Sequence, residues 1–256
     1  WLDVVGLATL ADMVSLRGEN RVLARYGLTV MQKTRRPGLQ HLFRKLGVDP
    51  KTMTEDDVGF SIAPRINAAS RMGKPEDAFA MLTANDEDAP MHANHLDRIN
   101  SERKGVVAAM VKDAKRRLAE RVNEESVIVI GNPLWRPSLA GLVANTLADE
   151  HRRPVFVWGR DGRDIFKGSC RSDGKVSVVS IMEGAKDSLI EFGGHHASGG
   201  FSIRPDFIHS FPSHIIDAHA RISDGNISES VEYLDADLSI KEITDESLGM
   251  NRTETV

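Results

Sequence analysis

The stretch Gly-Gly-His-His-Ala-Ser-Gly-Gly at residues 193–200 follows, by about twenty residues, the stretch Gly-Ser-Cys-Arg-Ser at residues 168–172. Four glycines in eight residues let the backbone take positive φ angles and bring its amides close to a ligand. A hydroxyl, a guanidinium and an imidazole beside such a loop are groups that hold a phosphate or the edge of a base. Glycine clusters alone are mostly turns. Pairing with Ser-x-Arg on a neighbouring strand therefore predicts a site for a phosphorylated polymer.

The residues around this pair fix its expected geometry. Ser169 and Arg171 alternate with Cys170 along the strand, so both point to one face, and Lys167 shares that face. Cys170 then packs inward and is not a nucleophile. The alternative to a phosphate-binding role is that these charged side chains only keep the edge of the sheet soluble. The adjacent histidines at 195–196 do not favour a zinc site, because neighbouring side chains diverge and no cysteine or acid lies close in sequence.

Hydrophobic spacing places this strand in an α/β fold. Helices are expected at 19–35 and 39–46, and the apolar stripe through 86–123 predicts one continuous helix. Beyond it, strands and helices alternate, which is typical of an α/β domain with helices against a mixed sheet. The expected strands are 127–130, 155–158, 164–170 and 199–203, and the expected helices are 138–150, 177–190 and 206–222. Another strand–helix pattern starts at 235–248.

Length and composition describe a globular protein with room for one large or two ordinary domains: 256 residues, 41% hydrophobic and 27% charged. The single cysteine excludes a disulfide framework and fits a reducing compartment. No apolar run in the sequence is long enough to cross a bilayer, and the first residues are not expected to be a secretory signal. The net charge of −4 gives no global sign of a nucleic-acid partner, so a polyanion must meet a local basic patch.

Two further places carry residues suited to chemistry. Asp12 stands in an otherwise apolar stretch, where it either caps a helix, forms a salt bridge or is held for a function, since burying a carboxylate unpaired is costly. Arg65 and Arg71 flank a run of small residues that includes Asn67, and two guanidinium groups around such a turn can clamp adjacent phosphates. The alternative is that one arginine pairs with an acid such as Glu76 or Asp77.

Taken in order along the chain, four motifs resemble those of the RecJ-type phosphoesterases of the DHH superfamily. The matching stretches are 6–14, 64–73, 168–172 and 193–200. The resemblance implies an α/β fold: the C-terminal part of a DHH catalytic domain at 1–85, a long connector helix at 86–123 and a DHH-associated substrate-binding domain with a mixed sheet at 124–222. Residues 223–256 are then the start of a following segment or linker before an OB-fold. We expect the chain to be an internal fragment of a longer protein.

The same resemblance implies roles for individual residues. Asp12 would ligate catalytic Mn²⁺ or Mg²⁺, with the remaining ligands, including the Asp-His-His triplet, upstream of Trp1. Arg65, Asn67 and Arg71 would contact substrate, Arg71 most directly. In the second pair of motifs, Ser169, Arg171 and His195 would bind a phosphate or sugar above the amides of Gly193 and Gly194.

The family usually has Trp-His-x-Gly where this chain has Trp135, Arg136, Pro137 and Ser138. Ser138 is expected to cap the helix that follows. Trp135 either stacks on a base or packs in the core.

The resemblance implies part of a metal-dependent 5′→3′ exonuclease acting on single-stranded DNA in repair and recombination, cytoplasmic and monomeric, with single-strand-binding or helicase proteins as cellular partners. One metal-ligating aspartate predicts that the fragment alone is inactive. Two alternatives stay open. One is a short-oligonucleotide or cyclic-dinucleotide phosphodiesterase of the same superfamily. The other is a catalytically inactive nucleic-acid-binding or helicase-associated scaffold.

Overall fold

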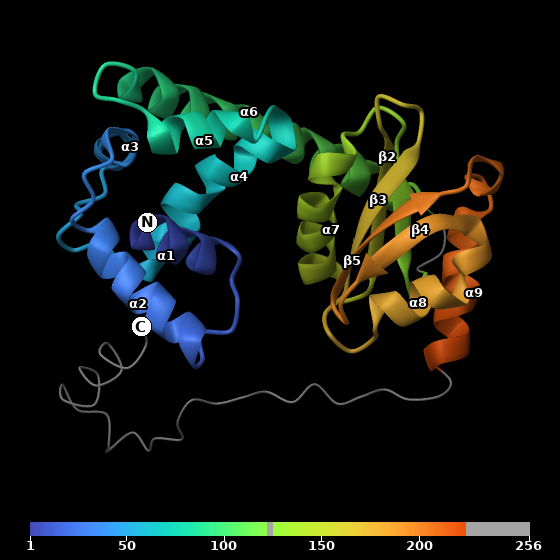
Figure 1. Ribbon diagram of the computed structural model, residues 1–256. Coiled ribbons are helices and arrows are strands. Elements are labelled where there is room, and N and C mark those ends of the chain that lie inside the picture. The colour runs from blue at the N-terminus through green and yellow to red at the C-terminus, as the bar shows by residue number, and fades with distance from the viewer. Residues whose placement is uncertain (122–124, 224–256) are drawn as a thin grey trace. The chain divides into compact units, whose positions relative to one another are not determined.

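The computed structural model describes residues 1–121 and 125–223, which form two compact units (Figure 1). Of these residues, the first unit holds Trp1–Arg103 and the second begins at Lys104, so the division falls inside helix α6 (Ala89–Ala119). None of the helices in the described ranges combines the length and apolarity that a membrane span requires.

The regular secondary structure of the first unit's described residues is all helical. Its elements before α6 are α1 (Leu2–Ala11), α2 (Glu19–Met31), α3 (Pro37–Leu46), the π-helix η1 (Asp57–Ile62), α4 (Ala63–Met72) and α5 (Glu76–Thr83). Helices α1 and α2 cross with their backbones in contact. A Cβ atom on Gly6 would lie 2.6 Å from the Cα of Gly27, and one on Gly27 would lie 2.4 Å from the Cα of Gly6. Only glycine permits this approach at both positions.

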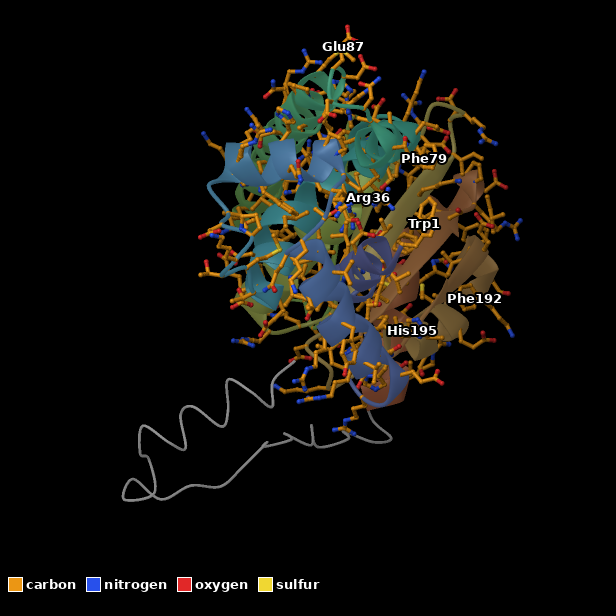
Figure 2. All side chains as sticks on the ribbon, turned by 60° about the vertical axis from the view of Figure 1, so that its left-hand side comes forward. Trp1, Arg36, Phe79, Glu87, Phe192 and His195 are labelled. Carbon is orange, nitrogen blue, oxygen red and sulfur yellow. The ribbon has the colours of Figure 1, made fainter. Side chains whose placement is uncertain are left out.

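A buried carboxylate joins α1 to the segment before α3. Asp3 is 5% exposed and accepts hydrogen bonds from Thr34 Oγ1 at 3.0 Å and Arg36 Nε at 2.8 Å. The Arg36 guanidinium also donates to the carbonyl of Leu82 and lies 4.9 Å from the centre of the Trp1 ring (Figure 2). Burial opposes ionisation of Asp3, but the hydrogen bonds from Arg36 and Thr34 outweigh it and hold its pKa below the usual value.

The long helix predicted at 86–123 is present as α6, one continuous helix of 31 residues and about 46 Å. It begins at Ala89 and not at 86. Pro90 accounts for this start, because proline is accommodated in the first turn of a helix and not in its interior.

The second unit is the predicted mixed α/β domain. Its sheet has the strand order β1-β2-β3-β5-β4, with β1 and β2 parallel and the other neighbours antiparallel. The strands are β1 (Ile128–Gly131), β2 (Val155–Arg160), β3 (Phe166–Arg171), β4 (Leu189–Gly194) and β5 (Ser198–Ile203). The helices after α6 are α7 (Pro137–His151), α8 (Val178–Gly184), η2 (Lys186–Ser188), η3 (Pro205–Phe207) and α9 (Phe211–Ser223).

Helix α7 covers one face of this sheet, against β2 and β3, and α8 and α9 cover the other (Figure 1). The core of the second face is built on Phe156, Cys170 and Phe201 from the strands and Met182 and Phe211 from the helices. Cys170 is fully buried there, as its alternation with Ser169 and Arg171 predicted.

Two predicted helices are wrong in part. The helix expected at 177–190 ends at Gly184, and residues 189–194 form strand β4, which the sequence analysis missed. Residues 206–222 are α-helical only from Phe211, because a separate 3₁₀-helix, η3, precedes α9. The strand–helix pattern expected at 235–248 lies outside the described residues.

Candidate functional site

The second unit brings Ser169 and Arg171 together on the face of the sheet that α7 covers. A Cβ atom built on Gly141 of α7 would lie 3.1 Å from Arg171 Nη2 and 3.5 Å from Ser169 Oγ. Both side chains therefore meet the same point of α7. Arg171 Nη1 also donates to the Cys170 carbonyl at 2.7 Å, which orients the guanidinium.

The strand register extends this face across β5 and β4. Ser169 pairs with Gly200, which pairs with Gly193, and residues opposite one another in antiparallel strands share a face. A Cβ on Gly193 would meet nothing within 4 Å. The sheet beside Ser169 therefore exposes bare backbone on the α7 side, where a ligand can approach closely.

A second row of polar side chains runs parallel to the first. Lys167 pairs with Ser202, and Ser202 pairs with Glu191, whose carboxylate accepts a hydrogen bond from Ser202 Oγ at 3.0 Å. Lys167 Nζ lies 3.6 Å from Asp161 Oδ2. A hollow of about 490 Å³ is lined by residues that include Ser138, Lys167, Glu191, Gly193 and Gly200, whereas Ser169 and Arg171 do not line it. The positive charges of Lys167 and Arg171 thus flank Ser169 along β3.

Gly141, which was not predicted from the sequence, is the point of α7 that faces Ser169 and Arg171. The available signal was a glycine inside a helical pattern, which costs helix stability and is retained where a larger side chain would clash.

The glycine-rich stretch was predicted to be a turn that presents amide groups, and this prediction is wrong for Gly193 and Gly194. Both lie in β4, an edge strand of the sheet formed by the described residues, paired with Gly200 and Gly199. Gly193 contributes an open strand surface and not a loop, whereas a Cβ on Gly194 would lie 2.3 Å from the Ser198 carbonyl oxygen. His195 follows in the connection to β5, where its backbone N–H donates to the Ser198 carbonyl at 2.7 Å and its side chain is exposed (Figure 2).

The start of α7 also differs from expectation. Arg136 is the N-cap residue and Pro137 occupies the first turn, so the prediction that Ser138 caps the helix is wrong. Ser138 lies within the first turn and lines the hollow. Trp135 is 5% exposed, which favours its packing role over stacking on a base.

In the first unit, Arg65, Asn67 and Arg71 all lie in helix α4, so the predicted turn between the two arginines is wrong. Arg65 Nε donates to Asp97 Oδ1 of α6 at 3.2 Å, and Arg65 Nη1 donates to the Ser61 carbonyl at 2.8 Å. The acid partner of Arg65 is thus Asp97, and neither Glu76 nor Asp77 takes that place. All three predicted contact residues are partly buried.

Asp12 lies at the C-terminal end of α1 with its side chain exposed. A carboxylate at this end of a helix interacts unfavourably with the helix dipole, so its presence there does not serve helix stability. Among residues 1–121 and 125–223, no group of three or more histidine, cysteine or acidic side chains is placed to hold a metal ion. The described residues therefore do not form a metal site, and Asp12 as a ligand stays a prediction.

A family model described as the DHHA1 domain matches residues 80–220, more than half of the chain. The chain belongs to this family, and the match covers the sheet with the Ser169–Arg171 face. The chain is also similar to proteins named single-stranded-DNA-specific exonuclease RecJ. It is 31% identical over 254 residues to the relative from Bacillus subtilis (strain 168), covering 97% of this chain and 32% of the relative. To the relative from Thermus thermophilus it is 32% identical over 225 residues, covering 88% of this chain and 32% of the relative.

A solved structure supports the same similarity. The crystal structure of RecJ in complex with Mn²⁺ from Thermus thermophilus superposes with a TM-score of 0.76 at 31% identity, covering 86% of this chain and 32% of that chain. A second, with Mg²⁺, gives a TM-score of 0.75. The chain spans about a third of the length of these relatives and structures.

Proposed function

We propose that this chain is the strand-binding part of a metal-dependent exonuclease that removes nucleotides from the 5′ end of single-stranded DNA. The observation that carries the proposal is the face of β3 on which Ser169 and Arg171 stand together beside the bare backbone of Gly193 and Gly200. Relatives about 30% identical carry the name single-stranded-DNA-specific exonuclease over this same region.

The chemistry of the face suits a nucleic-acid backbone. The Arg171 guanidinium supplies paired donors for phosphate oxygens, and the Ser169 hydroxyl adds a donor beside it. Lys167 adds a second positive charge on the same face, where the open hollow leaves room for a polymer. His195, exposed at the start of the β4–β5 connection, is proposed as a further donor to phosphate or sugar.

The division into a catalytic-domain remnant at 1–85, a connector helix at 86–123 and a substrate-binding domain at 124–222 belongs to the same proposal. So do action in the cytoplasm and a role in DNA repair and recombination. The metals found in the relatives' structures would supply an activated water and neutralise the leaving oxygen. Asp12 is proposed as one ligand, and the other ligands must come from groups beyond the described residues.

The proposal is tested by fluorescence anisotropy of a labelled single-stranded oligonucleotide with the full chain. Arg171→Ala should weaken binding by about 1–3 kcal/mol, roughly 5- to 150-fold, as for loss of a charge-assisted hydrogen bond. Arg163→Ala is the matched control, because Arg163 is an exposed arginine in the connection between β2 and β3. The same chain, incubated with Mn²⁺ and labelled oligonucleotide, should not cleave the strand.

Three results would count against this function. Equal affinity for the Arg171→Ala protein and the wild type would remove the proposed contact. Tighter binding of a cyclic dinucleotide than of an oligonucleotide would favour a different phosphodiesterase. Cleavage that is lost in Asp12→Ala would show that the chain holds a complete metal site.

A further inference from the structure

Helix α6 carries a buried side-chain amide that no described residue satisfies. Asn100 is 1% exposed, and neither its Oδ1 nor its Nδ2 atom has a hydrogen-bond partner among those residues. Buried polar groups are nearly always hydrogen-bonded, and an exception in a packed helix calls for a specific reason. Asn100 takes no part in the site described above.

One turn later on the same face of α6 stands Arg103, whose Nε is also sealed from solvent without a partner among the described residues. No described carboxylate pairs with this guanidinium. Burial lowers the pKa of Arg103, and the positive charges of Arg71 and Arg65 lower it further. Arg65 and Arg71 of α4 are thus close enough to Arg103 of α6 to repel its charge.

The carboxylate that pairs with Arg65 is already shared with a lysine. Asp97, about one and a half turns before Arg103, accepts from Arg65 at 3.2 Å, and its other oxygen lies 3.5 Å from Lys45 Nζ. One carboxylate is therefore shared between two cations. A partly buried guanidinium with no described counter-charge, beside two more, is an arrangement that an anion stabilises.

We propose that Arg103, supported by Asn100 and flanked by Arg65 and Arg71, binds a phosphate group of a nucleic-acid strand. The inference rests on the proposed function for the identity of the strand, and it adds two residues of α6 to the contacts expected on α4. Phosphate fits the donors better than a carboxylate does, since its oxygens diverge toward several guanidinium groups at once.

Two arms test the site with the full chain. In the first, thermal unfolding is followed in inorganic phosphate and in chloride at equal ionic strength. Phosphate should raise the unfolding midpoint of the wild type and not that of Arg103→Ala or Arg103→Gln, the latter keeping most of the aliphatic stem. In chloride, both variants should unfold at the wild-type midpoint or above it, because removing the charge relieves repulsion.

In the second arm, the variants bind a single-stranded oligonucleotide about tenfold more weakly than the wild type. The slope of log affinity against log salt should fall in magnitude by about 0.7, the loss of one phosphate contact. Arg98→Ala is the matched control, because it removes the same charge from an exposed position of α6. It should leave the phosphate response unchanged and weaken strand binding far less.

The outcomes separate this site from the proposed function. If phosphate raises the unfolding midpoint through Arg103 but the chain binds no oligonucleotide, the anion site is supported. A nucleic-acid strand is then ruled out as the source of the bound phosphate. Oligonucleotide binding that is insensitive to both Arg103 variants, with an equal phosphate response, would overturn the site and leave the proposed function standing. Lower midpoints in chloride for both variants, with unchanged affinities, would give Arg103 a structural role only.

Discussion

Gly141 offers a way to separate the packing of α7 from its contact with the proposed binding residues. Its Cα faces Arg171 and Ser169 so closely that an added Cβ would lie 3.1 Å from Arg171 Nη2 and 3.5 Å from Ser169 Oγ. The first distance is tighter than ordinary van der Waals contact. The nearest atom is the far end of a flexible side chain, so the guanidinium and not the backbone should move.

The expected effects of Gly141→Ala have opposite signs for stability and binding. Alanine is favoured over glycine in a helix interior by about 0.8–1.0 kcal/mol. A shift of Arg171 by a few tenths of an ångström offsets part of this, so the free energy of unfolding should rise by about 0–1 kcal/mol. Displacing the guanidinium while keeping its charge should weaken single-strand binding by about 1 kcal/mol, roughly fivefold.

Urea unfolding and oligonucleotide anisotropy measure the two effects on one preparation. Gly105→Ala is the control, because Gly105 is also a helical glycine and its Cβ would meet nothing within 4 Å. It should gain stability and keep wild-type affinity. A loss of stability in Gly141→Ala would mean that the backbone had moved. Unchanged affinity with a stability gain would refute the reasoning that the position of Arg171 decides binding.

Two further predictions concern single side chains. Burial raises the pKa of the Cys170 thiol to about 12, so at pH 8 a disulfide reagent should react only after unfolding in guanidinium, and rapid reaction of the native protein would contradict this. Because the folded-state pKa of Asp3 is lowered, its carboxylate stabilises the fold above the unfolded value of about 3.9, and this stabilisation is lost as the pH falls through the folded value. Asp3→Asn should therefore lower the free energy of unfolding by about 3 kcal/mol at pH 7, measured by denaturant titration. Below about pH 4 the difference between the variant and the wild type should be smaller. An equal difference at both pH values would show that the charge is not responsible.

Much of the second unit was predictable because its signals are local. The buried strand at 155–160 and the helix at 137–151 follow from apolar runs and spacing, and Ser169 and Arg171 share a face because strand side chains alternate. Strand β4 was missed for a physical reason. Its sequence ends in two glycines, and glycine has low strand propensity, so only pairing with β5 stabilises it as a strand.

The wrong prediction for α4 has a different cause. The run of small residues between Arg65 and Arg71 was interpreted as a turn, but Pro64 lies in the first turn of α4, where proline is favoured, and alanine is the best helix former. Local propensity therefore supported a helix, and the turn was inferred from the arginines on either side. Because α4 is a helix, Arg65 and Arg71 lie six residues apart along one helix and do not face each other across a loop.

Arg103 and Asn100 were beyond sequence reasoning because their significance is tertiary. In the sequence, Arg103 is one of several charged residues between 97 and 104, and its neighbours Glu102 and Lys104 are exposed. The one local signal was the three-residue spacing to Asn100, which places both side chains on one helical face. The packing of α4 near this face brings the guanidinium groups of Arg65 and Arg71 near Arg103. Positively charged guanidinium groups gathered around Arg103, together with a buried amide that no described residue satisfies, cost stability in the free protein. A bound anion would offset this cost, which gives the arrangement a physical explanation.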